Sequence, residues 1–358
     1  RQETPLVANG ASQPQNQRFT IVAKQLECNE DQDAVTVGLM LSADQTPEIV
    51  VDDSVPRFFA EGLPIIGTEN IPLPFIIHSS KFEVESDRTG LHLEGAGTGQ
   101  QKNNWALLSK VPDLCCALLE YSSRENWHGL HLLANIKECP HKDWLDSDHF
   151  TKSVLQNVAH RILTDSQIRL VQTTRGDHVS IKDAVVPCDD PEGKLFDLLS
   201  TWKPAKQGLV DRDLSAFWSG VLVNLAKVAS ADIKQLAAAW SIEHLASKIS
   251  ACGNLKALGE NVQLEQGEVT IDWLNRFISL TIASSNVHLL IGHSLLPNQH
   301  GNLCKLSELS HDPGVDDELK DIAMGAGIDE RSKFLDKRVA GLGEKLKDRT
   351  ELEVLNSL

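Results

Sequence analysis

The alternation of apolar and polar residues predicts β-structure at the start of the chain. Residues 18–26 and 34–42 are both rich in β-branched side chains, and a polar Asn-Glu-Asp-Gln-Asp link separates them. Two such runs joined by a polar link are typical of a β-hairpin. Residues 47–52 add a candidate third strand, and residues 63–93 mix prolines with short strands around a polar turn. We therefore expect a β-rich region over residues 18–100.

Helical spacing of apolar residues predicts a helical region over residues 101–166. Within residues 103–121 the apolar side chains recur at intervals of three and four, and Pro112 indicates a kink or a helix start. The pattern predicts two more helices here, at 127–136 and at 149–163, the second capped by Asp146 or Ser147.

The rest of the chain reads as a region of strands and helices over residues 167–330, followed by a charged C-terminal helix over residues 331–358. Strand character returns at 168–184 with a turn at Gly176, and residues 287–296 form an apolar run that predicts a strand. Helices are expected at 193–202, 214–228, 233–250, 271–284 and 316–324. The fold class is mixed α/β (α+β): a β-rich N-terminal part, a helical centre, and a C-terminal part of hairpins and helices.

Two segments of this last region resemble each other. Residues 170–184 and 295–309 each carry a strand, a glycine turn at Gly176 or Gly301, an apolar residue five positions later, and a polar-acidic pair. Glycine suits such a turn because it adopts positive φ without a steric penalty. A duplication and two unrelated hairpins of a common kind both remain open.

Composition and charge narrow the function classes. The 358 residues carry a net charge of −16, which disfavours nucleic-acid binding because phosphate contacts need clustered lysine and arginine. No apolar run reaches about 18 residues, so we expect no membrane partner. Residues 1–17 are polar and read as a disordered leader. The chain begins with Arg1 rather than methionine, and we expect it to be a fragment or a processed product.

The seven cysteines are odd in number and scattered, without a Cys-x-x-Cys motif. This usage indicates a reducing compartment, and we expect a cytoplasmic protein with free thiols. Cys115 and Cys116 lie in an apolar stretch and are expected in the core.

Three stretches of the chain, taken in order, resemble the sacsin family. They are Leu73-Pro-Phe-Ile-Ile-His-Ser-Ser-Lys-Phe82 with its continuation to Leu91, then TTRGDHVSIKDA at the Gly176 turn, and LPNQHGNLCKLSEL at the Gly301 turn. The resemblance covers residues 64–339, although Thr89 and His92 depart from the family pattern at its second arginine and its final aromatic residue.

The resemblance implies a chaperone-class ATPase of the GHKL type, with ATP and Mg²⁺ as cofactors of the parent protein. The chain lacks the acidic and glycine motifs of that nucleotide pocket, so the resemblance places the ATP lobe upstream of Arg1. This segment then holds no cofactor itself, and couples its own ATP lobe to unknown client or partner proteins. Arg88 matches the first arginine of the family motif, which implies a contact with the γ-phosphate.

Other motifs have plainer interpretations. The glycine-rich loop at 95–101 lacks the spacing of a phosphate-binding loop and reads as a linker. Asp189, Asp190 and Glu192 precede a helix and are expected to cap it. Gly292-His-Ser294 is not a nucleophile elbow. A local group of metal-capable side chains matches no structural zinc spacing: His128, His131, Cys139, His141 and His149.

Three functions follow from these observations. The first is the middle, coupling segment of a sacsin-like ATPase. The alternatives are a non-catalytic protein-interaction scaffold, and a GHKL-type protein of nucleic-acid handling or bacterial defence. The client and the oligomeric state are not encoded in any motif of this chain.

Overall fold

The computed structural model describes residues 19–24, 35–42, 48–95, 97, 99–264, 266–342 and 346–357. The leader expected at 1–17 lies outside the described residues. The chain forms two compact units, one of residues 1–186 with 210–239 and one of residues 187–209 with 240–358. Residues 187–209 thus belong to the second unit although they lie within the sequence range of the first.

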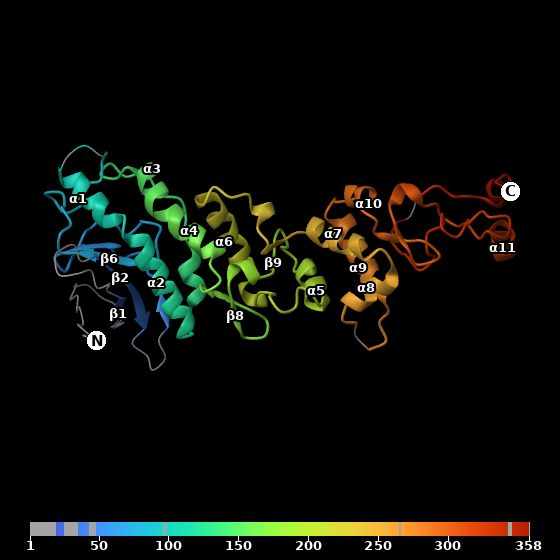
Figure 1. Ribbon diagram of the computed structural model, residues 1–358, viewed down its shortest axis with the longest axis horizontal. Coiled ribbons are helices and arrows are strands. Elements are labelled where there is room, and N and C mark those ends of the chain that lie inside the picture. The colour runs from blue at the N-terminus through green and yellow to red at the C-terminus, as the bar shows by residue number, and fades with distance from the viewer. Residues whose placement is uncertain are drawn as a thin grey trace. The chain divides into compact units, whose positions relative to one another are not determined.

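The mixed α/β class is confirmed, and the first unit contains the predicted sheet (Figure 1). The predicted hairpin is present, with Phe19 paired to Ser42. The strand order is β1-β2-β6-β4-β5, β3 pairs with β2, and only β4 and β6 run parallel. The strands are β1 (Phe19–Lys24), β2 (Val35–Ser42), β3 (Ile49–Val50), β4 (Phe58–Ala60), β5 (Leu63–Pro64) and β6 (Ile76–Ser79).

Helices cover β2 because that strand is apolar along almost its whole length. Helix α2 (Val111–Arg124) packs against β2, and Pro112 lies in its first turn, where a missing N–H costs nothing (Figure 1). Asp146 is the predicted cap, since its carboxylate accepts a hydrogen bond of 2.9 Å from His149 N. The other helices of this unit are α1 (Gly99–Leu108), η1 (Leu130–Ala134), α3 (Ser147–Phe150), η2 (Thr151–Leu155), α4 (Gln156–Thr164), η3 (Ile181–Asp183), η4 (Arg212–Leu214), α6 (Ser215–Val228) and η5 (Ile233–Gln235).

Two predicted helices are shorter than expected. Of the helix expected at 127–136, only the 3₁₀ helix η1 forms, because Gly129 enters it in the left-handed region with φ 78°. The helix expected at 233–250 is interrupted by strand β10 (Ala239–Trp240), and Ser241 caps a new helix by accepting from His244 N at 3.1 Å.

The second unit is built on stacked aromatic rings. The ring of Trp202 stacks on that of Trp273 with centroids 5.7 Å apart, and the Trp273 indole N–H donates to Thr201 Oγ1 at 2.8 Å. These contacts join helix α5 to helix α9. The helices of this unit are α5 (Lys194–Thr201), α7 (Ile242–Cys252), α8 (Leu255–Asn261), α9 (Thr270–Ala283), α10 (His288–Gly292), α11 (Asp317–Gly325) and α12 (Glu351–Leu355).

Two predictions fail in this unit. Half of the strand expected at 287–296 is helix α10, and strand structure begins only at Leu296, since a short apolar run does not distinguish a strand from a buried helix turn. The charged helix expected over 331–358 is limited, among the described residues, to α12. The preceding chain is extended because its backbone bonds to another segment: Leu335 N donates to Ser310 O at 3.0 Å, and Arg349 N donates to His311 O at 3.1 Å.

The predicted hairpin repeat is confirmed. The first copy is β7 (Val171–Gln172), β8 (His178–Val179) and η3 (Ile181–Asp183), and the second is β11 (Leu296–Pro297), β12 (Leu303–Cys304) and η6 (Leu306–Glu308). Gly176 and Gly301, 125 positions apart, have φ 84° and 82°. Each donates its N–H to the residue three positions earlier, at 2.9 and 2.8 Å.

The repeat extends further than its sequence pattern indicates. Asp211 N donates to Gln172 O at 2.8 Å, and Asp336 N, again 125 positions later, donates to Pro297 O at 2.9 Å. The bond from Val210 N to Val185 O is matched by that from Leu335 N to Ser310 O, both at 3.0 Å. A constant offset over so many backbone contacts favours duplication over chance. The copies differ at α6 (Ser215–Val228), because of the described residues at the same offset, 340–342 and 346–353, only 351–353 are helical, as the start of α12.

Candidate functional site

Arg88 lies in a tight turn at the end of the N-terminal region. Arg88 N donates to Glu85 O at 2.9 Å, and Glu85 N donates to Gly90 O at 3.1 Å. Arg88 itself adopts φ 58°, a conformation that costs a non-glycine residue free energy. A Cβ atom at Gly90 would lie 2.3 Å from Trp144 Cγ, so only glycine lets the turn approach this ring.

The Arg88 side chain is half-buried and interacts with the backbone. Its Nη2 donates to Ala60 O at 3.2 Å, and among the described residues no carboxylate forms an ion pair with it. Phe82 is buried behind the turn, as the alternation predicts, and Val84 is half-buried. The guanidinium therefore retains hydrogen-bonding capacity and an uncompensated charge.

A hollow of about 560 Å³ lies beside the same turn. Glu85, Glu94 and Asp143 are among its lining residues, and Arg88 is not. Lys142 and His141 line the hollow as well, and His141 Nε2 lies 3.6 Å from Asp143 Oδ1. The carboxylates still outnumber the basic side chains, which disfavours a phosphate in this hollow. The chemistry of Arg88 is separate from it.

The remaining predicted motifs have structural roles. In the glycine-rich loop, Gly97 N donates to Gln101 Oε1 at 2.9 Å, while residues 96 and 98 lie outside the described residues. The predicted capping is confirmed for Asp190, whose carboxylate accepts from Leu195 N at 3.0 Å and from Phe196 N at 2.7 Å.

The histidines expected as a local group make separate contacts. The His131 ring lies edge-on to Phe217 at 5.1 Å, the His149 ring lies edge-on to Trp105 at 4.3 Å, and burial lowers the pKa of His131. Across the described residues, no three metal-capable side chains converge on one point.

The predicted core cysteines are confirmed. Cys115 and Cys116 are buried, and burial raises the pKa of the Cys116 thiol to about 11. Burial likewise raises the pKa of Cys115 well above its ordinary value. No disulfide joins the six cysteines that the structure describes. These thiols are packing groups, not nucleophiles, at neutral pH.

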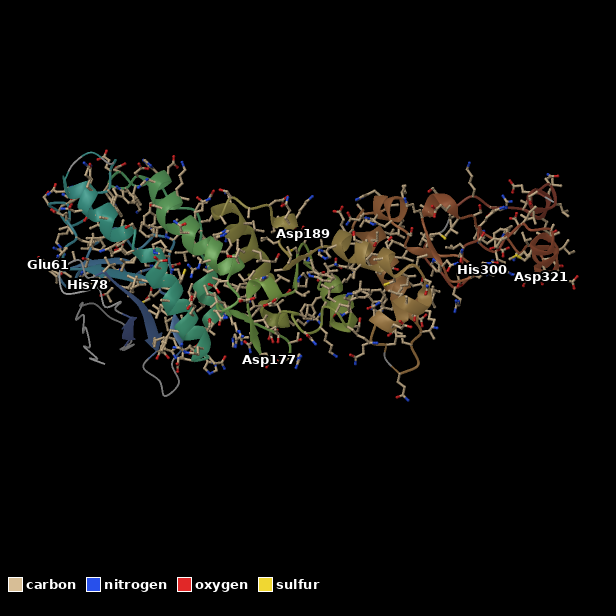
Figure 2. All side chains as sticks on the ribbon, in the orientation of Figure 1. Glu61, His78, Asp177, Asp189, His300 and Asp321 are labelled. Atoms are coloured by element: carbon tan, nitrogen blue, oxygen red, sulfur yellow. The ribbon has the colours of Figure 1, made fainter. Side chains whose placement is uncertain are left out.

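Two features escaped the sequence reasoning. A second hollow, of about 450 Å³, lies at the Gly301 turn, with Lys256, His300 and Arg338 among its lining residues. Figure 2 labels His300 at this turn and Asp177 at the equivalent turn of the first copy. Comparison of the two copies at the 125-residue offset is the signal that finds it. The other feature is the buried ion pair of Asp312 with Lys320, whose charged atoms lie 2.7 Å apart. The periodicity of apolar residues in the sequence does not indicate such a pair.

Comparison of the chain with protein-family models, with curated proteins and with solved structures finds no match. None of the helices in the described part of the chain has the length and apolar character needed to cross a membrane.

Proposed function

We propose that this chain is the middle, coupling segment of a sacsin-like, chaperone-class GHKL ATPase, acting in the cytoplasm. It transmits the nucleotide state of an ATP lobe preceding Arg1 to a client or partner protein. ATP and Mg²⁺ are cofactors of that lobe, and this segment contributes a single arginine to it.

The observation that supports the proposal is the state of Arg88. Its guanidinium bonds to the neutral Ala60 carbonyl and has no carboxylate partner among the described residues. A residue that stabilises charge on a γ-phosphate has to retain its own charge, as Arg88 does. It also has to reach out of its domain, which requires the half-buried Arg88 side chain to leave the Ala60 carbonyl. The strained backbone at φ 58° is of the kind that concentrates at functional sites.

The test has two stages. Calorimetric titration of this chain with Mg-ATP should show no binding in the micromolar range, because the chain lacks the pocket motifs. In the longer protein with the ATP lobe, Arg88→Ala should lower kcat for ATP hydrolysis by roughly ten-fold to a thousand-fold, as expected for loss of one charge partner of a transition state.

Arg169→Ala is the matched control, since Arg169 is an exposed arginine of the same unit and its side chain has no partner in the described structure. It should hydrolyse ATP at the parental rate. An Arg88→Ala protein with parental kcat, or tight Mg-ATP binding by the segment alone, would refute the proposal.

A further inference from the structure

The Ala60 carbonyl that holds Arg88 lies at the start of a strained turn. The turn joins β4 to β5 through Glu61 and Gly62, which both have positive φ, 54° and 80°. Two such residues suit a two-residue hairpin, but the left-handed conformation costs Glu61 free energy because it is not glycine. The Ala60 carbonyl belongs to the peptide group that joins Ala60 to Glu61, so its direction depends on this turn. The bond that it accepts from Arg88 Nη2, at 3.2 Å, depends on the turn as well.

His78 holds this turn from the neighbouring strand. It lies in β6, which runs parallel to β4, and its Nε2 accepts a hydrogen bond from Gly62 N at 3.1 Å. A ring nitrogen that accepts carries no proton, so this bond requires the neutral imidazole. Burial of the half-buried His78 ring lowers its pKa and thereby favours the neutral form. At neutral pH the bond to Gly62 is therefore retained.

The strands on either side give His78 an uncharged setting. Its partners in register are Thr36 in β2 and Phe59 in β4, and neither strand has an ionisable side chain within its bounds. The charged residues that adjoin these strands are Glu61 in the turn and Lys81 just after β6, which are both exposed and opposite in sign. Burial is therefore the main factor that opposes protonation of the ring.

We propose that His78 is a positioning residue for Arg88, and that protonation of His78 releases Arg88 from the Ala60 carbonyl. A protonated ring presents an N–H to the Gly62 N–H, so the bond between them is lost and the strained turn is no longer held. Arg88 can then leave the sheet, as a contact with a phosphate requires. The inference rests on the proposed function of Arg88 and states how that same site is regulated.

Acid favours release because protons bind more tightly to the released state. Burial and the bond from Gly62 both oppose protonation of His78 in the docked state. Once the turn opens, the pKa of the ring lies nearer its ordinary value of about 6.5. By linkage, docking of Arg88 is fully favoured above that pH and is lost as pH falls below it.

The test follows the turn and Arg88 by NMR in this chain. Hydrogen-exchange protection is measured for the Gly62 amide, relative to the intrinsic exchange rate at each pH. Rotation of the Arg88 guanidinium is measured by carbon-detected NMR of isotope-labelled arginine, with the signal assigned from Arg88→Lys. Between about pH 7.5 and about pH 5, the protection should fall and the rotation should accelerate, each by about ten-fold, as expected for loss of one hydrogen bond.

His78→Gln should abolish this pH dependence, because the glutamine side-chain oxygen can accept from Gly62 N at every pH. His160→Gln is the matched control, since His160 is an exposed histidine of the same unit that lies on α4 and not on the sheet. It should keep the pH dependence of the parent. In the longer protein with the ATP lobe, His78→Gln should lower kcat relative to the parent by a factor that grows as pH falls, with KM for ATP unchanged.

The role of His78 is overturned if the Gly62 and Arg88 signals do not respond to acid, or if they respond equally in His78→Gln. It is also overturned if Arg88→Ala lowers kcat while His78→Gln keeps the parental pH profile. Parental kcat in Arg88→Ala refutes the ATPase proposal instead, and the NMR signals of this chain then decide separately whether His78 positions Arg88.

Discussion

Breaking the buried ion pair of Asp312 with Lys320 should destabilise the second unit strongly. The side chains are 1% and 0% exposed, and Lys320 Nζ lies 2.7 Å from Asp312 Oδ2. The same carboxylate accepts from Gln299 Nε2 at 2.8 Å, from Gly314 N at 3.0 Å and from Val315 N at 2.8 Å. It therefore ties α11 to the extended chain that precedes it.

Asp312→Asn removes the charge while retaining an oxygen that accepts from the two backbone N–H groups. Lys320 then stays buried with only the exposed Asp317 carboxylate, at 3.2 Å, as its charge partner. Removing one member of a buried pair typically costs about 3–5 kcal/mol, because the remaining ion is left uncompensated. We expect a loss of that size in the free energy of unfolding of the second unit. Asp312→Leu combined with Lys320→Met should restore most of it.

Amide hydrogen exchange measures this free energy when it is resolved to peptides of residues 187–209 and 240–358. These peptides report the unfolding of the second unit separately from that of the first. Asp348→Asn is the control, since Asp348 pairs with His311 at 2.8 Å but is exposed, and its loss should cost under about 1 kcal/mol. A loss from Asp312→Asn no larger than that of the control would refute the reasoning.

The same pair predicts an acid dependence. Burial of Asp312 opposes its ionisation, but the hydrogen bonds from Lys320, Gln299, Gly314 and Val315 outweigh burial and hold the pKa of the carboxyl well below its ordinary value. A depressed folded-state pKa contributes stability that is complete above the unfolded pKa, about 3.9, and is lost as pH falls through the folded pKa. The parent should therefore lose stability below about pH 4 more steeply than Asp312→Asn does.

Two further predictions concern the backbone and the first unit. Gly176→Ala and Gly301→Ala should each lower the free energy of unfolding by about 1 kcal/mol, because alanine is strained at positive φ. Gly220→Ala inside α6 should instead raise it by about 0.5–1 kcal/mol. Urea unfolding measures all three variants, and a change of the same sign in all of them would contradict the argument. Arg57→Met should leave the free energy of unfolding unchanged or raise it by up to about 2 kcal/mol. The buried Nε and Nη1 atoms of Arg57 lack partners, and Asp53, which pairs with Nη2 at 3.3 Å, is exposed. A loss above about 1 kcal/mol in thermal unfolding would contradict this prediction.

Elements with strong local patterns could be predicted from the sequence. The hairpin of β1 and β2 follows from two β-branched runs, and α6, α9 and α11 follow from helical spacing close to their observed bounds. The interruption of the helix expected at 233–250 could not be predicted, because Trp240 becomes a strand residue by pairing with a distant segment. The new helix start is local, since Ser241 Oγ accepts from His244 N three residues later. Secondary-structure propensities reflect the local sequence and do not include contacts with distant segments.

The C-terminal segment shows how a charge pattern can mislead. Residues 331–358 alternate acidic and basic side chains in a way typical of a solvated helix. Several of these charges instead form pairs across the fold, such as Arg349 with Glu330 at 2.8 Å, where the carboxylate is fully buried. Gly341, at φ 85°, further disfavours a continuous helix. Partners distant in sequence decided the conformation.

The two candidate sites also differ in how much of each could be predicted from the local sequence. A local motif selects Arg88 as a candidate, and the structure adds that no carboxylate within the described part of the chain pairs with it. The Gly301 hollow is not visible in either copy of the repeat alone. The bridges of Thr173 with Val210 and of Asn298 with Leu335 show that both copies keep the same backbone frame, although the helix α6 that follows the first copy is not matched by a helix at residues 340–342 and 346–350.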